Sequence, residues 1–587
     1  MNYKFELYAF HIPADPPNQI IPLQKHYVEA SLDKTINDLA EDAAGVPRAS
    51  PSSRSKGLTW RSCILRERSS PAYHDVHSKL KDKPEHALED LAEDSGSLSR
   101  KRQRTASTDE EDLMPLMKNF KQYTNHVLTW KTPSAAAKSS AYEDNQSARF
   151  ARLDGRFAGD KGVETTAPPI ELYHPTFAQF VALAQAQVDD PKDGDILRDA
   201  AALIRSCSQI EMQEGPRNTK TRELLQRILR IPFERVINDD QSAANYIALH
   251  ATPLDSVAAS SAILEVKAEL GSTGTDPSVQ ASFSFGRFYC QPQRNAITEH
   301  SNCPTFIVGI AGPWLVVMGA VLTTRVVAQR LSDFMWLGCS RTMDEAQVKR
   351  VASTLYALRR AIQTLNQLWN SFKKPKIVEG CEHPRFFPYW DSFTDEHREV
   401  VNFVYVKPLE DWPSCVTFLA KRLPGNGGSD DKDSRFVIKF VRRYERDAHA
   451  VMGKEGFAPK LLGFRQLREE DSGYKDLVLV AMEYVEGKAL CDLYNDNALP
   501  AEVKQGVQDA LQALNGAGYI FADLRRPNVM VRASDEKVQL IDFDWVCKMD
   551  GGMRYPFHLS PDIKCRSKAK DYDVITLDHQ NRMFEVL

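Results

Sequence analysis

The chain reads GYIFADLRRPNVMVRASDEKVQLIDFDW from Gly518 to Trp545. Here Asn528 follows Asp523 by five positions, and Asp542 ends an apolar strand fourteen residues after the asparagine. In phosphoryl transfer, one carboxylate orients the attacking hydroxyl, while an Asn and a second Asp hold Mg²⁺ against the nucleotide phosphates. A hairpin of two short apolar strands would bring Asn528 and Asp542 together. The spacing therefore predicts a catalytic base at Asp523 and metal ligands at Asn528 and Asp542.

The stretch resembles the catalytic loop and the metal-binding loop of the protein-kinase superfamily, and this resemblance places Arg525 near the transferred group. Upstream, the β-branched run 435–441 contains Lys439. This is the pattern of the kinase strand whose lysine reaches the α- and β-phosphates of ATP. A helical segment follows and offers Glu445 or Asp447 as the carboxylate partner of Lys439. The sequence leaves the choice between these two acids open.

A buried strand begins at Leu477 and runs into a linker that ends at Gly487. By the same resemblance, this linker is the hinge between two kinase lobes, where backbone groups of Glu483 to Val485 hold the adenine. The resemblance implies a two-lobed protein kinase-like domain over residues 386–587. Its cofactors would be ATP and Mg²⁺.

Several positions depart from the usual kinase pattern. Phe521 and Ala522 replace the His-Arg pair before the catalytic Asp, and Asp544 replaces the Gly after Asp-Phe. No G-x-G-x-x-G precedes Lys439, although residues 424–428 are rich in glycine. Because Ala522 cannot pair with an activation-loop phosphate as an Arg would, we expect activity to be independent of activation-loop phosphorylation.

The departures are similar to one branch, the fungus-specific kinase-like domains. The similarity is carried by Asp-Leu-Arg-x-x-Asn, Ile-Asp-Phe-Asp-Trp, the Arg-Tyr-Pro of 554–556 and a C-terminal Ile575-x3-His579. That branch carries an Asp after the final His, where this chain has Gln580. The expected function is an ATP-dependent phosphotransferase, a divergent Ser/Thr protein kinase acting on a protein substrate that the sequence does not identify. Two alternatives stay open: a small-molecule phosphotransferase of the aminoglycoside-kinase type, and a pseudokinase or interaction module.

The middle region, 166–372, carries a second set of candidate residues. An apolar strand over 262–271 contains Glu265 and Lys267, which point to the same side because side chains alternate along a strand. A helix near 276–288 would present Gln280, and an earlier helix contains Glu223. A helix, three strands, a helix and a strand, with Glu-x-Lys and a helical Gln, resemble the α/β restriction-endonuclease-like fold of the PD-(D/E)XK nucleases.

Nuclease chemistry of that kind is metal-assisted phosphodiester hydrolysis, and it requires another acid on the strand before Glu-x-Lys. Asp240 is the nearest carboxylate, but no Asp-Gly occurs there. We therefore expect the middle domain to contact nucleic acid or a partner rather than to cut DNA. The cations expected at the phosphates are Lys267, Arg287 and Arg294.

Residues 1–165 are rich in Ser, Ala and charged residues with little periodicity, which predicts a largely disordered region. Its basic cluster at 100–104 is typical of a nuclear-import signal. The apolar run 307–322 contains three glycines and a proline, so we expect two buried strands and no membrane segment. Ten cysteines without a C-x-x-C pair favour an intracellular protein, nuclear or cytoplasmic.

The net charge of −4 argues against nucleic-acid binding over the whole surface. The length of 587 residues predicts two or three domains. The expected fold class is α+β multidomain. It comprises a disordered N-terminal region, an α/β nuclease-like middle domain and the kinase-like C-terminal domain.

Overall fold

The computed structural model describes five short strands between Tyr3 and Glu67, and residues 114–587 except 160–164, 187–193, 212, 239–240, 243, 245, 255–256, 272–273, 343, 412, 424–434 and 558. The chain divides into two compact units, Met1–Arg104 and Thr105–Leu587. In the first unit, β1 (Tyr3–Tyr8) pairs antiparallel with β4 (His26–Ala30) and β5 (Ile64–Glu67), and β2 (Phe10–His11) pairs with β3 (Ile21–Pro22). The basic cluster at 100–104 lies outside the described residues.

The expectation of disorder as far as residue 165 is wrong for the part that follows residue 113. Three helices form there: α3 (Pro115–Leu128), α4 (Pro133–Ala136) and α5 (Ser139–Ser147). One face of α3 buries Leu116, Phe120, Tyr123 and Val127, a spacing of three and four residues that places them in one stripe. Polar residues surround this stripe, so the composition of the segment did not indicate a helix.

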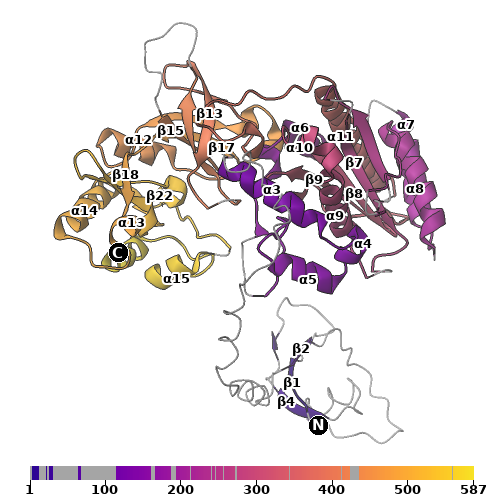
Figure 1. The fold of residues 1–587 in the computed structure, drawn as a ribbon. Coiled ribbons are helices and arrows are strands. Elements are labelled where there is room, and N and C mark those ends of the chain that lie inside the picture. The colour runs from indigo at the N-terminus through magenta and orange to yellow at the C-terminus, as the bar shows by residue number, and fades with distance from the viewer. Residues whose placement is uncertain are drawn as a thin grey trace, which may run out of the picture. The chain divides into compact units, whose positions relative to one another are not determined.

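The middle of the chain is built on a mixed sheet, here called the middle sheet, with the order β10-β9-β8-β7-β6 (Figure 1). Only β7 and β8 are parallel, and α9 connects them. The apolar run 307–322 forms the two strands β8 and β9. The nuclease-like order of helix and three strands expected a strand near 233–238, but no strand forms there, and Glu234 joins Ile247 by an isolated bridge. The bounds are β6 Tyr246–Ala251, β7 Ala258–Lys267, α9 Pro277–Tyr289, β8 Thr305–Ala311, β9 Trp314–Leu322 and β10 Val326–Arg330.

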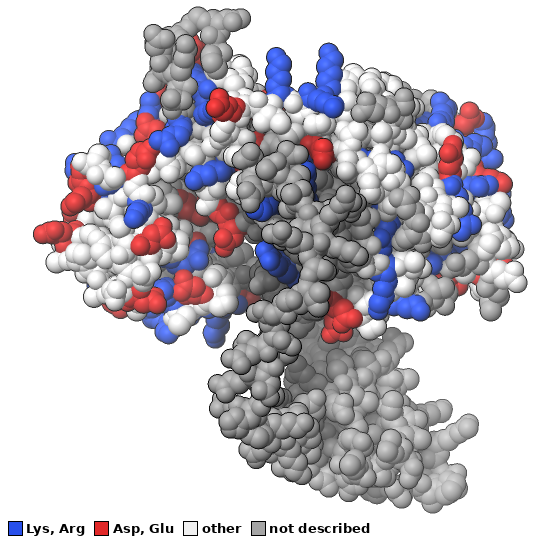
Figure 2. Space-filling model, viewed as in Figure 1, with Lys and Arg blue, Asp and Glu red and all other residues white. Residues whose placement is uncertain are grey.

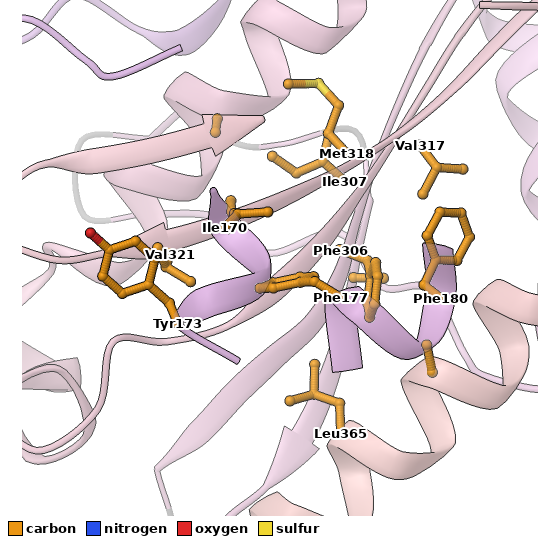
Figure 3. Close-up of a cluster of buried hydrophobic side chains, with 14 of the residues drawn as sticks. Ile170, Tyr173, Phe177, Phe180, Phe306, Ile307, Val317, Met318, Val321 and Leu365 are labelled. Carbon is orange, nitrogen blue, oxygen red and sulfur yellow. The ribbon is translucent and has the colours of Figure 1, made fainter. Parts of the chain in front are cut away.

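The helices α6 (Pro175–Gln185), α8 (Glu214–Leu229) and α11 (Asp344–Asn370) pack against the middle sheet, as α9 does, and α7 (Gly194–Cys207) packs on α8 and α11. Figure 3 shows the core between α6 and the sheet, where Phe177 and Phe180 approach Phe306 with ring centroids 5.2 and 5.8 Å apart. Leu365 of α11 joins this cluster. No helix in the described ranges is long and apolar enough to cross a membrane.

The C-terminal region begins with a six-stranded sheet, here called the antiparallel sheet, in the order β12-β13-β14-β15-β17-β16. Helices and short hairpins follow, and their buried side chains form a separate hydrophobic cluster. The bounds are β12 Ser392–Thr394, β13 Val400–Pro408, β14 Thr417–Arg422, β15 Arg435–Val441, α12 Arg446–Lys454, β16 Leu461–Gln466, β17 Val478–Glu483, β18 Gly487–Ala489, α13 Leu490–Tyr494, α14 Ala501–Gly516, β19 Tyr519–Phe521, β20 Val529–Arg532, β21 Val538–Leu540, β22 Val546–Lys548, α15 Pro561–Ser567 and α16 Leu577–Glu585.

The antiparallel sheet and the middle sheet share one continuous hydrophobic core. Arg385 lies at the junction, is 4% exposed, and donates to the carbonyl oxygens of Ser301, Leu322 and Thr323 at 3.1, 2.7 and 3.3 Å. A side chain at Gly473 would collide with the backbone of Ala178 in α6. The residues expected to link separate domains, 373–385, therefore lie within one compact unit.

Candidate active site

The catalytic-loop candidates lie on adjoining short strands and loops. Asp523 follows β19, which pairs with β22, and is 4% exposed. Asn528 donates from its side-chain nitrogen to the Asp523 carbonyl oxygen at 2.9 Å. The hairpin β20–β21 pairs Val529 with Leu540, and the Ile541 N–H donates to the Asn528 carbonyl at 3.0 Å. Asp542 is the next residue, so the hairpin places Asn528 and Asp542 side by side.

Arg525 holds the carboxylate of Asp523 with two hydrogen bonds. Its Nε donates to Oδ1, and its Nη2 donates to Oδ2 at 2.7 Å. Burial lowers the pKa of Arg525, but the hydrogen bonds and charge of Asp523 outweigh it, so the pKa is raised overall. Bidentate pairing of this kind fixes the direction of a carboxylate as well as its charge.

Lys439 on β15 is 5% exposed and reaches two carboxylates. Its Nζ lies 2.8 Å from Asp542 Oδ1 and 2.9 Å from Asp544 Oδ2. Burial lowers the pKa of Lys439, but the two carboxylates outweigh this effect and raise it. The ammonium is therefore charged.

The helix acids expected to pair with Lys439 do not do so. Asp447 is exposed in the first turn of α12. Glu445 precedes the helix, and its N–H donates to the Phe543 carbonyl at 3.1 Å. Burial, followed by the negative charge of Asp447, raises the pKa of the Glu445 carboxyl. Lys439 instead pairs with Asp542 and Asp544 of the loop 542–544. In the sequence, Asp544 was noted only as the residue that replaces glycine after Asp-Phe.

The residues at this loop fit a Mg²⁺ ion. Burial raises the pKa of Asp544 well above its usual range, and the neighbouring charge of Asp542 raises it further. At Asp542, burial acts to raise the pKa, but the charge of Lys439 and the hydrogen bonds from Lys439 and Asp544 together outweigh it and lower that pKa. Two carboxylates thus share one ammonium, and Asp544 Oδ1 is buried without a hydrogen-bond partner in the part of the chain that is described.

No group of three or more His, Cys, Asp or Glu that could hold a metal occurs among the described residues. The donors that would hold the ion are Asp542 and the amide oxygen of Asn528. This set suits Mg²⁺, which is usually bound by one or two carboxylates together with substrate phosphates.

An aromatic cluster holds the loop 542–544. The His449 ring of α12 lies parallel to Phe543, with centroids 4.6 Å apart, and Phe521 meets Phe543 edge-on at 5.8 Å. His449 Nε2 donates to the Pro459 carbonyl at 2.8 Å, which leaves Nδ1 to accept from the Tyr444 hydroxyl at 2.7 Å. The sequence analysis missed His449, whose only signal was its place on a short helix beside the lysine strand.

Acid is expected to destabilise the protein through His449. Burial lowers its pKa to about 4, while the unfolded value is near 6.5, so below pH 6.5 the unfolded state binds a proton that the folded state does not. The free energy of unfolding is therefore highest above pH 6.5 as far as His449 is concerned, and it decreases as the pH falls toward 4. His449 alone contributes about 2 kcal/mol to the loss between pH 7 and pH 5, which urea unfolding measures by comparison with a variant lacking this histidine. The His449→Gln variant should lose less over this interval, whereas replacing the exposed His397 with Gln should change nothing. Equal acid sensitivity in all three proteins would contradict this.

The hinge residues lie at the end of β17. The Glu483 N–H donates to the Lys460 carbonyl at 2.9 Å, and its carboxylate accepts from the Lys460 N–H at 3.1 Å. Val485 is half-buried in the linker between β17 and β18. Because the Glu483 N–H is already used, an adenine would have to find its donor elsewhere in the linker.

Two C-terminal side chains form hydrogen bonds with the backbone just before Asp523. The side-chain oxygen of Gln580 on α16 accepts from the Phe521 N–H at 2.8 Å, and its nitrogen donates to Asn515 at 3.2 Å. The Tyr555 hydroxyl donates to the Ala522 carbonyl at 3.3 Å. Gln580 is buried, so its amide satisfies both a donor and an acceptor that would otherwise be unpaired.

The candidates in the middle domain come together only in part. Glu265 is 0% exposed, and its carboxylate accepts from Gln280 Nε2 at 3.0 Å and from the Ser284 hydroxyl at 2.9 Å. Lys267 is also buried, on the same strand. Glu223 is exposed on α8 and so does not join the buried Glu265, and Asp240 lies outside the described residues.

The arginines expected at phosphates serve packing instead. Arg287 is buried and donates to the carbonyls of Leu128, Trp130 and Lys131, which ties α9 to the end of α3. Arg294 donates to the Ala258 carbonyl at 2.8 Å. Figure 2 shows both signs of charge interspersed over the described part of the viewed face.

No protein-family model matches the chain. Over 117 residues, 19% of its length, the chain is 30% identical to a probable serine/threonine-protein kinase of Clostridium perfringens, and it spans 16% of that relative. A solved kinase of Cydia pomonella granulovirus, PK-1, aligns with 18% identity and a TM-score of 0.23, covering 31% of this chain and 65% of that one. Part of the chain is therefore similar to a Ser/Thr kinase, and the likeness is partial.

Proposed function

We propose that residues 386–587 are an ATP- and Mg²⁺-dependent phosphotransferase, a divergent Ser/Thr protein kinase of the fungus-specific kinase-like branch. The observation that carries this proposal is the convergence of Lys439, Asp523, Asn528 and Asp542 from separate strands and loops. Each of these side chains is polar, and three of them are more than nine-tenths buried. Burying polar side chains costs free energy unless they are hydrogen-bonded or paired. Clusters of such groups are typical of functional sites.

In the proposed reaction, Asp523 accepts the proton of the attacking hydroxyl while that oxygen bonds to the terminal phosphorus and the bond to ADP breaks. Arg525 orients the carboxylate of Asp523 through two hydrogen bonds, and its charge lies where negative charge develops on the transferred group. Lys439 holds the α- and β-phosphates. Mg²⁺, when bound at Asn528 and Asp542, neutralises charge on the phosphates.

The antiparallel sheet and the C-terminal helical part are proposed to be the two lobes, with the nucleotide between them. Their separate hydrophobic clusters support this division. The middle domain is proposed to be a nuclease-like scaffold without nuclease activity, since Gln280 and Ser284 already occupy the carboxylate of Glu265. A partner or nucleic acid at its surface remains a proposal.

The test uses the purified full chain, Mg²⁺ and ATP labelled at the γ-phosphate. Label is expected on Ser or Thr of the chain itself or of added protein acceptors, identified by phosphoamino-acid analysis. Label found only on aminoglycosides would instead favour the small-molecule phosphotransferase. Absence of transfer to every acceptor, together with absence of nucleotide binding, would remove the enzyme proposal.

A further inference from the structure

The ammonium of Lys439 is almost wholly buried, so it depends on fixed carboxylates for its position. Two carboxylates contact it, and both come from the loop 542–544. Asp542 is also the residue assigned to Mg²⁺ under the proposed function. When Asp542 binds a cation, the other carboxylate within contact distance of Lys439 is that of Asp544.

The backbone around Asp544 is held on both sides. Phe543 is stacked on the ring of His449 and meets the ring of Phe521 edge-on. On the other side, the Trp545 carbonyl accepts from the Ala522 N–H at 3.0 Å. The three residues Phe543–Trp545 form a single turn of 3-10 helix that begins at Asp542, whose φ of +70° turns the chain sharply. Asp544 is thus a short side chain on a rigid turn, which fixes its carboxylate against Lys439.

We propose that Asp544, and not an acid of the neighbouring helix, is the residue that positions Lys439 for the nucleotide phosphates. The proposal rests on the proposed phosphotransferase function. It implies that the carboxylate partner of Lys439 lies on the loop 542–544, which His449 of α12 holds through the ring of Phe543.

The first test measures binding of the Mg²⁺ complex of a non-hydrolysable ATP analogue by calorimetry. The Asp544→Asn variant keeps the shape and removes the charge, and it is expected to weaken binding about tenfold or more. The matched controls Asp447→Asn and Glu445→Gln remove the helix acids and should stay within about twofold. The Asp544→Glu variant should recover part of the affinity. Full affinity in Asp544→Asn, or a loss confined to the helix variants, would overturn the proposal.

A second readout is independent of catalysis. An amine-reactive reagent is applied to the full-length protein without nucleotide, and labelling of individual lysines is quantified by mass spectrometry. Labelling of Lys439 should rise several-fold in Asp544→Asn, while Lys267, which is buried in the middle sheet, serves as an internal reference and stays unchanged. A rise at both lysines, or at neither, would count against a positioning role. If the wild type binds no nucleotide, the proposed function fails, and the labelling still decides whether Asp544 holds Lys439.

Discussion

Replacing Asp523 with Asn is expected to slow phosphoryl transfer by about 10² to 10⁴-fold, the usual range for loss of a general base. The amide has the same shape but cannot accept the hydroxyl proton, and it offers Arg525 only one oxygen. Nucleotide binding should change little, since Lys439 and Asp542 are left in place. Initial rates with labelled ATP, measured beside nucleotide affinity, would separate the two effects.

The control for this variant is Asp535→Asn. Asp535 lies in the turn of the same hairpin, is 34% exposed in its side chain, and pairs with Arg532. It should retain the wild-type rate. A rate in Asp523→Asn close to that of Asp535→Asn would show that Asp523 is not the base.

Replacing Arg385 with Leu is expected to lower the free energy of unfolding by about 3–5 kcal/mol, because each buried acceptor left without a donor costs about 1–3 kcal/mol. The carbonyls of Ser301, Leu322 and Thr323 would lose their donor inside the core, and the Phe120 ring would lose the guanidinium that lies 4.0 Å from its centroid. Urea unfolding of the full-length protein measures the change.

Exposed Arg341 provides the matched variant, because its replacement with Leu should alter stability by no more than about 0.5 kcal/mol. A similar small change in Arg385→Leu would mean that the junction between the two sheets contributes little. Expression of residues 386–587 alone is a complementary check. That fragment lacks Arg385 and the middle sheet, so it should be poorly soluble.

The elements nearest the catalytic loop could be predicted because their signals are local. The β-branched run around Lys439 forms β15, and the two apolar strands that flank residues 533–537 form the hairpin that joins Asn528 to Asp542. The helix that presents Gln280 also has local signals, an Asp at its N-cap and a Pro in its first turn. Such patterns depend on neighbours along the chain, which the sequence displays directly.

The partner of Lys439 could not be predicted in this way. Asp544 is 105 positions from Lys439, and its contact depends on how the cluster of His449, Phe543 and Phe521 orients the loop. The same holds for Arg385, whose acceptors lie 62 to 84 positions away. An arginine is usually exposed, so nothing local marks this one as buried.

The close contact between Gly473 and Ala178 bears on how such a protein could arise and diversify. A recombination event that moved the C-terminal coding segment into another gene would deliver an antiparallel sheet whose Gly473 has no α6 backbone to meet and whose N-terminal Arg385 has no carbonyls to bind. The two halves should therefore be inherited together. Insertions would be tolerated in exposed loops of either half, and far less between residues 381 and 391, where the chain is buried at Arg385 and Phe386.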